Sequence, residues 1–426
     1  MKVAVVGGGL AGLAAGLALC DAGCEVHLFE RSRLLGGRAT SFEIDGVEVD
    51  NGQHVFLGCC DEFIDFVDRL GLRSELYVQE RFDALVIDRN GKAARLRAAP
   101  LPAPWHLIAS FLRFRHLNLR SKLDVARALA YAKRNAAPPE CTFAQWLQSR
   151  RQGAQALAAF WEPFFVPALN EPLGEMDARE ALFTLRTAFL GDASAACFGY
   201  SKRPLARIAE RAAQRFLNVR RSTSVSSLEI CENDARALVT TAGERLEFDA
   251  FVLALTPPQL RSLLRDPQRY GIDSLDAYVP HPIVDVHLRY GHGADAGARF
   301  DFAALIGSPV QWIFRKAAGY LVCSMSAAHE YVRYANDDLV RLAWNEVRAA
   351  LPVLKDARLD RGAVTRNVEA TFSLPSGVER PGAKTAIENV TIAGSWTATG
   401  WPDTMESAVR SGRGAASTLL RGRAAP

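Results

Sequence analysis

The chain has 426 residues, long enough for about two or three domains, and its 49% hydrophobic and 23% charged composition is that of an ordinary globular protein. The formal net charge of +4 is small for this length and argues against a nucleic-acid-binding protein. No apolar run reaches about 18 residues, so we expect no transmembrane helix. The glycine-interrupted apolar N-terminus predicts a strand rather than a signal peptide.

The cysteines are scattered along the chain. The sequence holds 8 of them, without a C-x-x-C pair and without a histidine cluster. A zinc site and a thioredoxin-like motif are therefore excluded, and we expect reduced thiols, no metal and a cytosolic location.

The first forty residues predict a dinucleotide site. The apolar run Val3–Val6 predicts a buried parallel strand, and a G-x-G-x-x-G turn leads from it into a helix that begins at Leu10 and Ala11. The glycines of this turn are Gly7, Gly9 and Gly12. Amides at the start of that helix can hold a pyrophosphate. The alternative is a glycine turn in an ordinary βαβ unit.

Glu30 ends the next predicted strand, residues 25–29, close to the place where an acid binds a ribose 2′-hydroxyl. A carboxylate there disfavours a 2′-phosphate, so NADP is not expected at this site. The strand, the helix pattern and the acid fall in register, which favours dinucleotide binding over the plain turn.

Further along the chain, alternation around Asp45-Gly46 and Asn90-Gly91 predicts hairpins over residues 41–50 and 83–95. Helical composition follows from Trp105 to about residue 195. Strands return from residue 217, a helix is predicted over residues 337–351, and residues 390–394 form another buried strand before a last helix over residues 404–420.

The fold predicted from this order is α/β. A Rossmann-like nucleotide-binding domain is discontinuous, over residues 1–95, 196–262 and 362–426. A helical insertion occupies residues 96–195, and a strand-rich substrate domain occupies residues 263–361.

A second glycine motif, Gly36-Gly37-Arg38, follows Glu30 by a short loop. Two glycines allow the backbone to approach a bound group, and Arg38 offers a phosphate or flavin partner. Together with the first motif and the closing segment, residues 392–412, it resembles the FAD-binding pattern of the amine oxidase and carotenoid desaturase superfamily.

A narrower resemblance is to the hydroxysqualene dehydroxylases, also called squalene-associated FAD-dependent desaturases. It is carried by residues 50–59, residues 308–314 and the segment from Gly394 to Gly412, in order along nearly the whole chain. The family usually has an acid where this chain has Ser395. A serine hydroxyl can still bond to ribityl hydroxyls, so we expect FAD binding to persist, and the role of that acid is in doubt.

The resemblance implies FAD as cofactor and adds further cofactor contacts to the glycine motifs. They are Arg31 beside Glu30, Gly52, Gln53 and His54, Val225 at the adenine, and Gly394, Ser395, Thr404 and Met405 at the flavin end.

The implied reaction is reductive removal of the allylic hydroxyl of hydroxysqualene to give squalene, a step of hopanoid and isoprenoid synthesis. An allylic C–O bond can ionise when the leaving hydroxyl is protonated, and reduced flavin can deliver hydride to that carbon. The alternatives are an oxidative carotenoid-type desaturase, an amine oxidase, for which we cannot place the usual lysine near the flavin, and a non-catalytic isoprenoid carrier.

His54 is the candidate acid, because an imidazole titrates near neutrality, and Gln53 is a candidate hydrogen-bond donor to substrate or flavin. The alternative for His54 is a histidine that bonds the flavin or backbone and moves no proton. Trp312, Trp396 and Trp401 are candidate walls of an isoprenoid pocket, where indoles also stabilise a developing cation. Core packing is their alternative.

Residues 105–116 mix apolar and cationic side chains, and Lys122, Arg127, Lys133 and Arg134 follow. This pattern predicts an interfacial helix on anionic lipid, with Phe111, Leu112 and Phe114 as its apolar contacts. A lid helix with a solvated basic face is the alternative. We therefore expect a cytoplasmic protein in peripheral contact with the inner face of the cytoplasmic membrane.

A second glycine-rich stretch, residues 291–297, has G-x-G-x-x-x-G spacing and no following βαβ unit. It predicts a turn rather than a second nucleotide site. We therefore expect no resident nicotinamide cofactor, and electrons that come from a separate donor.

Overall fold

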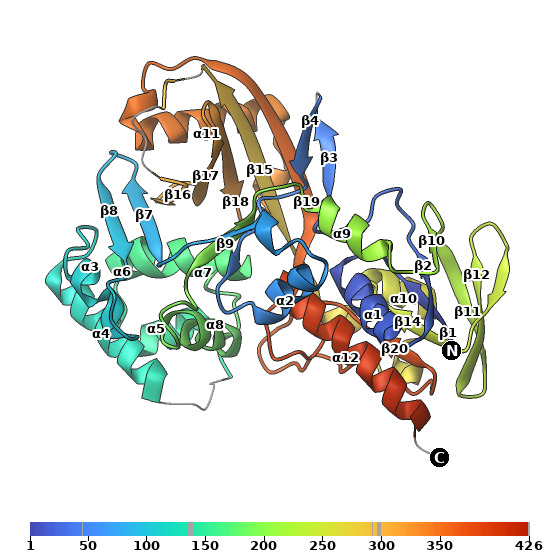
Figure 1. Ribbon diagram of the computed structural model, residues 1–426. Coiled ribbons are helices and arrows are strands. Elements are labelled where there is room, and N and C mark those ends of the chain that lie inside the picture. The colour runs from blue at the N-terminus through green and yellow to red at the C-terminus, as the bar shows by residue number, and fades with distance from the viewer. Residues whose placement is uncertain (45, 135–139, 292, 296–299, 425–426) are drawn as a thin grey trace.

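The computed structural model describes residues 1–44, 46–134, 140–291, 293–295 and 300–424 (Figure 1). Part of the glycine-rich stretch at 291–297 and the Asp45 position of the first hairpin thus lie outside the described residues. None of the described helices is long and apolar enough to cross a membrane.

A five-stranded parallel sheet, in the order β10-β2-β1-β14-β20, forms the centre of the nucleotide-binding half. Its strands are β1 (Lys2–Val6), β2 (Glu25–Phe29), β10 (Asn218–Arg220), β14 (Ala250–Leu253) and β20 (Val390–Ile392). All four residues of β14 are buried, as expected for a parallel sheet that is covered on both faces. The predicted α/β class is confirmed.

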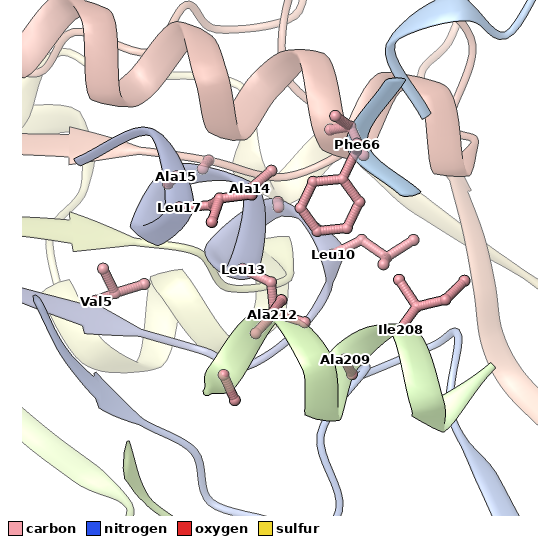
Figure 2. Packing of buried hydrophobic residues seen from close by; sticks show 14 of the residues in the cluster. Val5, Leu10, Leu13, Ala14, Ala15, Leu17, Phe66, Ile208, Ala209 and Ala212 are labelled. Carbon is pink, nitrogen blue, oxygen red and sulfur yellow. The ribbon is translucent and has the colours of Figure 1, made fainter. Parts of the chain in front are cut away.

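Helices cover one face of this sheet. They are α1 (Leu10–Asp21), α2 (Asp61–Arg69), α9 (Ala206–Ala213) and α12 (Met405–Ala424). Figure 2 shows Leu10 and Leu13 of α1 directed towards Ile208 and Ala212 of α9, with Phe66 of α2 beside them. Small side chains on α1 allow this close packing, since Ala14 and Ala15 are buried.

The other face is covered by α10 (Pro257–Leu264) and an antiparallel sheet of β11 (Val225–Cys231), β12 (Asp234–Thr240) and β13 (Arg245–Glu247). Residues of α10, β12 and β14 share one hydrophobic core there with Trp396. The sheet is therefore enclosed by two separate cores, and its strand ends are left for the loops.

A seven-stranded, mostly antiparallel sheet forms the second half, in the order β19-β15-β18-β17-β16-β7-β8 (Figure 1). Its strands are β7 (Asp83–Asp88), β8 (Ala93–Arg97), β15 (Val279–Tyr290), β16 (Phe302–Ile306), β17 (Trp312–Ala317), β18 (Tyr320–Met325) and β19 (Leu359–Ser373). One face packs against α11 (Asn336–Ala350), close to the predicted helix.

The opposite face of this sheet packs against the helical insertion, through a core rich in aromatic side chains. The insertion contains a turn at Trp105–Leu107, α3 (Ile108–Leu112), α4 (Leu119–Arg134), α5 (Phe143–Ser149), α6 (Ala154–Ala156), α7 (Glu162–Leu169) and α8 (Ala178–Thr184).

Two small sheets connect the halves. The first hairpin pairs β3 (Ser41–Ile44) with β4 (Val47–Asp50), and β9 (Phe198–Ser201) pairs with β5 (Phe56–Leu57) and β6 (Leu76–Val78). Both lie beside the segment of residues 51–55.

Sheet membership divides the chain differently from the predicted domains. Residues 83–95 and 362–373 were assigned to the nucleotide-binding half, but β7, β8 and β19 hydrogen-bond into the seven-stranded sheet. Local alternation identifies a strand without identifying its partner, so the hairpin at 83–95 carried no sign of the sheet it joins.

Candidate active site

The first glycine turn is as tight as its sequence requires. Gly7 has φ of 108°, and a Cβ on Gly12 would lie 2.0 Å from the Gly7 carbonyl oxygen. Gly9 is the N-cap of α1. No side chain of the described residues caps the start of this helix, and an uncapped helix start is the arrangement that holds a pyrophosphate.

Glu30 lies beside this turn at the end of β2. Its Oε2 accepts from the Gly8 amide at 2.7 Å and its Oε1 from the Ser32 amide at 2.8 Å. The Thr223 amide donates to the Glu30 carbonyl at 2.9 Å, which brings the start of β11 and Val225 to the same side of the sheet. Arg31 follows with an exposed side chain.

The second glycine motif touches the first. The Gly36 amide donates to the Gly8 carbonyl at 2.8 Å, and a Cβ on Gly37 would lie 3.0 Å from the Gly9 Cα. Gly36 and Gly37 also have φ values of 101° and 59°, which favour glycine. The two motifs therefore form one backbone surface.

Arg38 extends from this surface to the closing segment. It donates to Asp403 Oδ2 at 3.0 Å and to Ser395 Oγ at 2.5 Å. Asp403 Oδ2 also accepts from the Phe372 amide at 2.7 Å. The carboxylate that the resemblance places at 395 is absent, and a carboxylate eight positions on, at Asp403, meets Arg38 instead.

The closing segment joins β20 to α12. The buried Gly394 donates to Ser411 Oγ at 2.9 Å, and a Cβ there would lie 2.2 Å from the Trp396 indole nitrogen. Thr404 precedes Met405, the first residue of α12, and its Oγ1 accepts from the Ser407 amide at 3.3 Å. Helix α12 lies against α1, so the N-termini of both helices belong to one region (Figure 1).

The Gly52–His54 segment faces the seven-stranded sheet. The Gln53 amide donates to Asp285 Oδ2 at 3.2 Å, and the Gln53 side chain bonds weakly back to the His54 carbonyl, at 3.4 Å. His54 Nδ1 is 2.8 Å from the Gly52 carbonyl oxygen, so this nitrogen carries the proton. Burial lowers the pKa of His54, although Asp50 raises it. A neutral imidazole favours the bonding alternative over a proton-donating one.

The structure separates the three tryptophans proposed as pocket walls. Trp312 of β17 lies in the aromatic core, with its indole N–H donating to the Pro163 carbonyl. Trp401 is half-buried and packs edge-on against Phe183 of α8. Trp396 is fully buried in the core under the five-stranded sheet and donates to the Leu255 carbonyl at 2.8 Å. For Trp396 the core alternative therefore holds, because no face of the indole is open.

A polar group that was not predicted from the sequence lies opposite Gln53. Asp285 and His287 of β15 are both buried, and His287 Nδ1 is 2.8 Å from the hydroxyl of Tyr320 on β18. Burial raises the pKa of Asp285 to about 6 and lowers that of His287 to about 4. The signal was present, since polar residues at positions 285, 287 and 289 alternate with the apolar residues Val284, Val286 and Leu288.

These residues fit an FAD. The uncapped helix start, the buried Glu30 carboxylate and the two touching glycine loops provide, in order, the contacts for a pyrophosphate, a ribose and a close-lying ring system. The segment at Gly52–His54 and the start of α12 flank the remaining side.

Comparison with known proteins agrees with this geometry. The chain is similar to the hydroxysqualene dehydroxylases of Zymomonas mobilis (26% identical) and Rhodopseudomonas palustris (28%), with 98% of each chain covered. It is also similar to the zeta-carotene desaturase of Solanum lycopersicum, at 25% identity over 98% of this chain and 81% of that protein.

Among solved structures, putrescine oxidase bound to putrescine has the same fold, with a TM-score of 0.78, 17% identity and 99% of both chains covered. The family described as flavin containing amine oxidoreductase matches residues 10–420. The chain therefore belongs to the flavin-containing amine oxidoreductase family, and its cofactor is FAD.

Proposed function

We propose that the protein is a reductive dehydroxylase that removes the hydroxyl of hydroxysqualene to give squalene. The hydroxysqualene dehydroxylases of two bacteria match the chain over 98% of its length. The observation that carries the proposal is an aromatic layer on the seven-stranded sheet that ends at polar groups beside the Gly52–His54 segment.

The aromatic layer suits a long apolar substrate. Phe302, Trp312 and Phe198 lie with ring centroids 4.8 to 5.8 Å apart. Val55, directly after His54, packs against this same core. An isoprenoid chain bound beside Phe198 and Val55, the partly exposed members of this layer, would bring its head to the segment that carries Gln53 and His54, where hydrogen-bonding groups can meet an oxygen atom.

When bound, FAD supplies hydride transfer at the flavin ring. The chain's own residues bind and orient: the α1 amides hold the pyrophosphate, Glu30 holds the ribose, and Ser395 with Asp403 keeps Arg38 at the flavin end. A neutral His54 offers its Nε2 as an acceptor. Apolar residues of the layer exclude water, which protects an allylic cation from addition of water.

Carotenoid desaturation is the second candidate, because zeta-carotene desaturases match at 24–25% identity. A hydrocarbon offers no oxygen to the polar groups opposite Gln53, whereas an alcohol does, and this favours the dehydroxylase. We also propose that electrons arrive from a separate donor, since the sequence shows one dinucleotide fingerprint.

The test is an anaerobic single turnover. Holoenzyme is chemically reduced and mixed with hydroxysqualene, and flavin absorbance and products are followed. Return of the oxidised flavin spectrum with squalene formed one-for-one supports the proposal. A saturated alcohol of similar length should leave the flavin reduced, because it cannot form an allylic cation.

Reduction of the oxidised enzyme by a polyene or by an amine, with no reaction of the alcohol, would replace the dehydroxylase with a desaturase or an amine oxidase. Binding of the alcohol without either electron transfer would indicate a carrier.

A further inference from the structure

A buried polar cluster lies on the inner face of β15. Val284, Val286 and Leu288 of this strand belong to the core with α11. Because side chains alternate along a strand, Asp285 and His287 face the opposite side, towards the helical insertion and the Gly52–His54 segment. Ser324 of β18 and Thr365 of β19 are the paired neighbours of Asp285.

The Asp285 carboxyl meets the backbone of that segment directly. Its Oδ2 accepts from the Gln53 amide at 3.2 Å, and a Cβ on Gly52 would lie 3.3 Å from Oδ2 and 3.6 Å from the His54 ring carbon Cε1. Glycine at 52 thus leaves the carboxyl and the imidazole close together. The position of Asp285 is fixed by a strand on one side and by the Gln53 amide on the other.

One oxygen of this carboxyl lacks a well-formed hydrogen bond. Asp285 is 1% exposed, and its Oδ1 is buried with no hydrogen bond of ordinary geometry from the described residues, although the nearby Ser324 hydroxyl favours the charged carboxylate. An unbonded buried carboxylate oxygen is destabilising, because it has lost its water and gained no donor. The cost of burying the carboxyl is smaller when the group is protonated and therefore neutral, or when a bound molecule supplies the missing contact.

The groups that face Asp285 come from every neighbouring element. The titratable groups that act on it or feel its charge are Asp50 at the end of β4, Lys316 of β17, and Tyr320 and Cys323 of β18, while Ser324 and Thr365 are its paired neighbours in the sheet. Burial raises the pKa of Asp285 to about 6, Ser324, the Gln53 amide and Lys316 oppose this, and Asp50 adds to it. His54 is held neutral with its proton on the nitrogen that faces Gly52, so it has no proton to give.

We infer that Asp285 is the proton donor to the leaving hydroxyl, held in place by the Gln53 amide, and this inference rests on the proposed function. The Asp285 O–H bond breaks as its proton bonds to the allylic oxygen. The C–O bond then breaks and water leaves. The carbon receives hydride from two-electron-reduced FAD, and the Asp285 carboxylate regains a proton from solvent.

The experiment compares Asp285→Asn with Asp295→Asn, a matched control. Asp295 is equally buried, but its Oδ2 accepts from the Arg315 guanidinium at 2.6 Å. Although burial acts to raise it, Arg315 and Tyr290 hold the pKa of Asp295 below its usual value. The two aspartates therefore differ in whether the protein prefers them protonated.

The first readout is melting temperature against pH, which needs no substrate. A carboxyl with a raised pKa loses stability as pH rises from about 4 to about 6, and the loss persists above. Asp285→Asn should therefore raise the melting temperature at pH 8 by about 3 °C or more and leave it unchanged at pH 4. Asp295→Asn should lower it at pH 8.

The second readout is the anaerobic single turnover. Asp285→Asn should slow reoxidation by hydroxysqualene about 100-fold or more with little change in substrate affinity. Reoxidation of the same reduced variant by dioxygen should keep the wild-type rate, because that reaction needs no proton from Asp285 to a leaving hydroxyl.

A variant that melts lower at pH 8, or one that turns over as fast as the wild type, would overturn the assignment. If the wild type itself is not reoxidised by the alcohol, the proposed function fails. The melting curves then still decide whether Asp285 is held protonated.

Discussion

Single glycines set the distance between the two helices at the nucleotide site. A Cβ on Gly412 of α12 would lie 2.1 Å from the Ala11 carbonyl oxygen, whereas Gly414 on the same helix has open space around it. The contact partner at 412 is backbone of the helix start that we assign to the pyrophosphate. A side chain at 412 cannot be accommodated by a rotamer change.

We predict that Gly412→Ala destabilises the protein by about 2–4 kcal/mol and lowers FAD retention, because α1 must move away from α12. Gly414→Ala should instead stabilise by up to about 1 kcal/mol, since alanine is the better helix former. Denaturant unfolding and the flavin-to-protein absorbance ratio measure both effects. Equal behaviour of the two variants would contradict the close approach.

Residue types at the glycine motifs were predictable from sequence, because only glycine permits their backbone conformations and approaches. Asp285 was not, although its strand was. Its importance depends on which loop crosses the strand, and the pairing of Gln53 with a residue 232 positions away leaves no local pattern. Asp403 was missed for the same reason, since its partner Arg38 lies far upstream.

Helices α3 and α4 carry a surface that the sequence pattern only partly located. Phe114, predicted to contact lipid, is fully buried, and Phe111 packs edge-on against Phe160. Leu112, predicted with them, is exposed, and further exposed apolar side chains come from the neighbouring positions Leu101, Trp105, Ile108, Leu119 and Leu123. Periodicity could not separate the inner from the outer apolar positions in so short a helix.

Cationic side chains accompany these exposed apolar side chains along the chain. Lys122 of α4 donates to the Leu112 carbonyl at 2.6 Å, which ties the start of α4 to the end of α3. Arg113, Arg115 and Arg120 are exposed beside them. Apolar side chains next to cations are complementary to an anionic lipid surface, and we propose these residues as the membrane contact.

Replacing Leu112 and Leu119, 62% and 77% exposed, by serine should weaken binding to anionic liposomes about 10-fold or more. Leu217→Ser is the control, because Leu217 is 65% exposed next to β10, at the opposite end of the molecule (Figure 1). Co-sedimentation at low and high salt measures the apolar and the electrostatic contributions to liposome binding. If the double variant binds liposomes as well as the wild type, the helices do not contact lipid through these side chains, and a lid helix with a solvated basic face is the better interpretation.

The whole molecule contains buried groups whose titrations oppose one another. Burial lowers the pKa values of His281 and His287 to about 4. The folded protein therefore loses stability as pH falls below about 6.5, where these histidines would be protonated in the unfolded chain. Glu171, after α7, has a pKa raised to about 9, chiefly by burial and then by Glu180, while Arg380 opposes the shift. Its protonated form is favoured in the folded chain, so stability falls as pH rises from about 4.5 towards 9.

Above pH 6.5 the histidines are neutral in the folded and in the unfolded chain, so Glu171 dominates the pH dependence of stability among these three groups. We predict that the melting temperature falls by about 5 °C or more between pH 6.5 and pH 9. Glu171→Gln should remove most of this fall and leave the pH dependence below about pH 4.5 unchanged. A decline of the same size in the variant would assign the alkaline instability to another group.

At the scale of the molecule, the α/β class was predictable, because strands such as β1, β14 and β20 are short, largely apolar and followed by a turn. The border between the two sheets was not. The hairpin of β7 and β8 is local, but β7 also pairs with β16, and β19 pairs with β15. Hydrogen bonds between strands so far apart in the chain leave no trace in local composition.

The central sheet takes β1 from the first residues of the chain and β20 from the last forty. Its cofactor cradle therefore stays incomplete on the ribosome until β20 and α12 have been synthesised, when β20 joins β14 and α12 closes over α1. Flavin capture thus has to wait for segments about 390 residues apart, and a yellow product reports that β1 and β20 lie in one folded body.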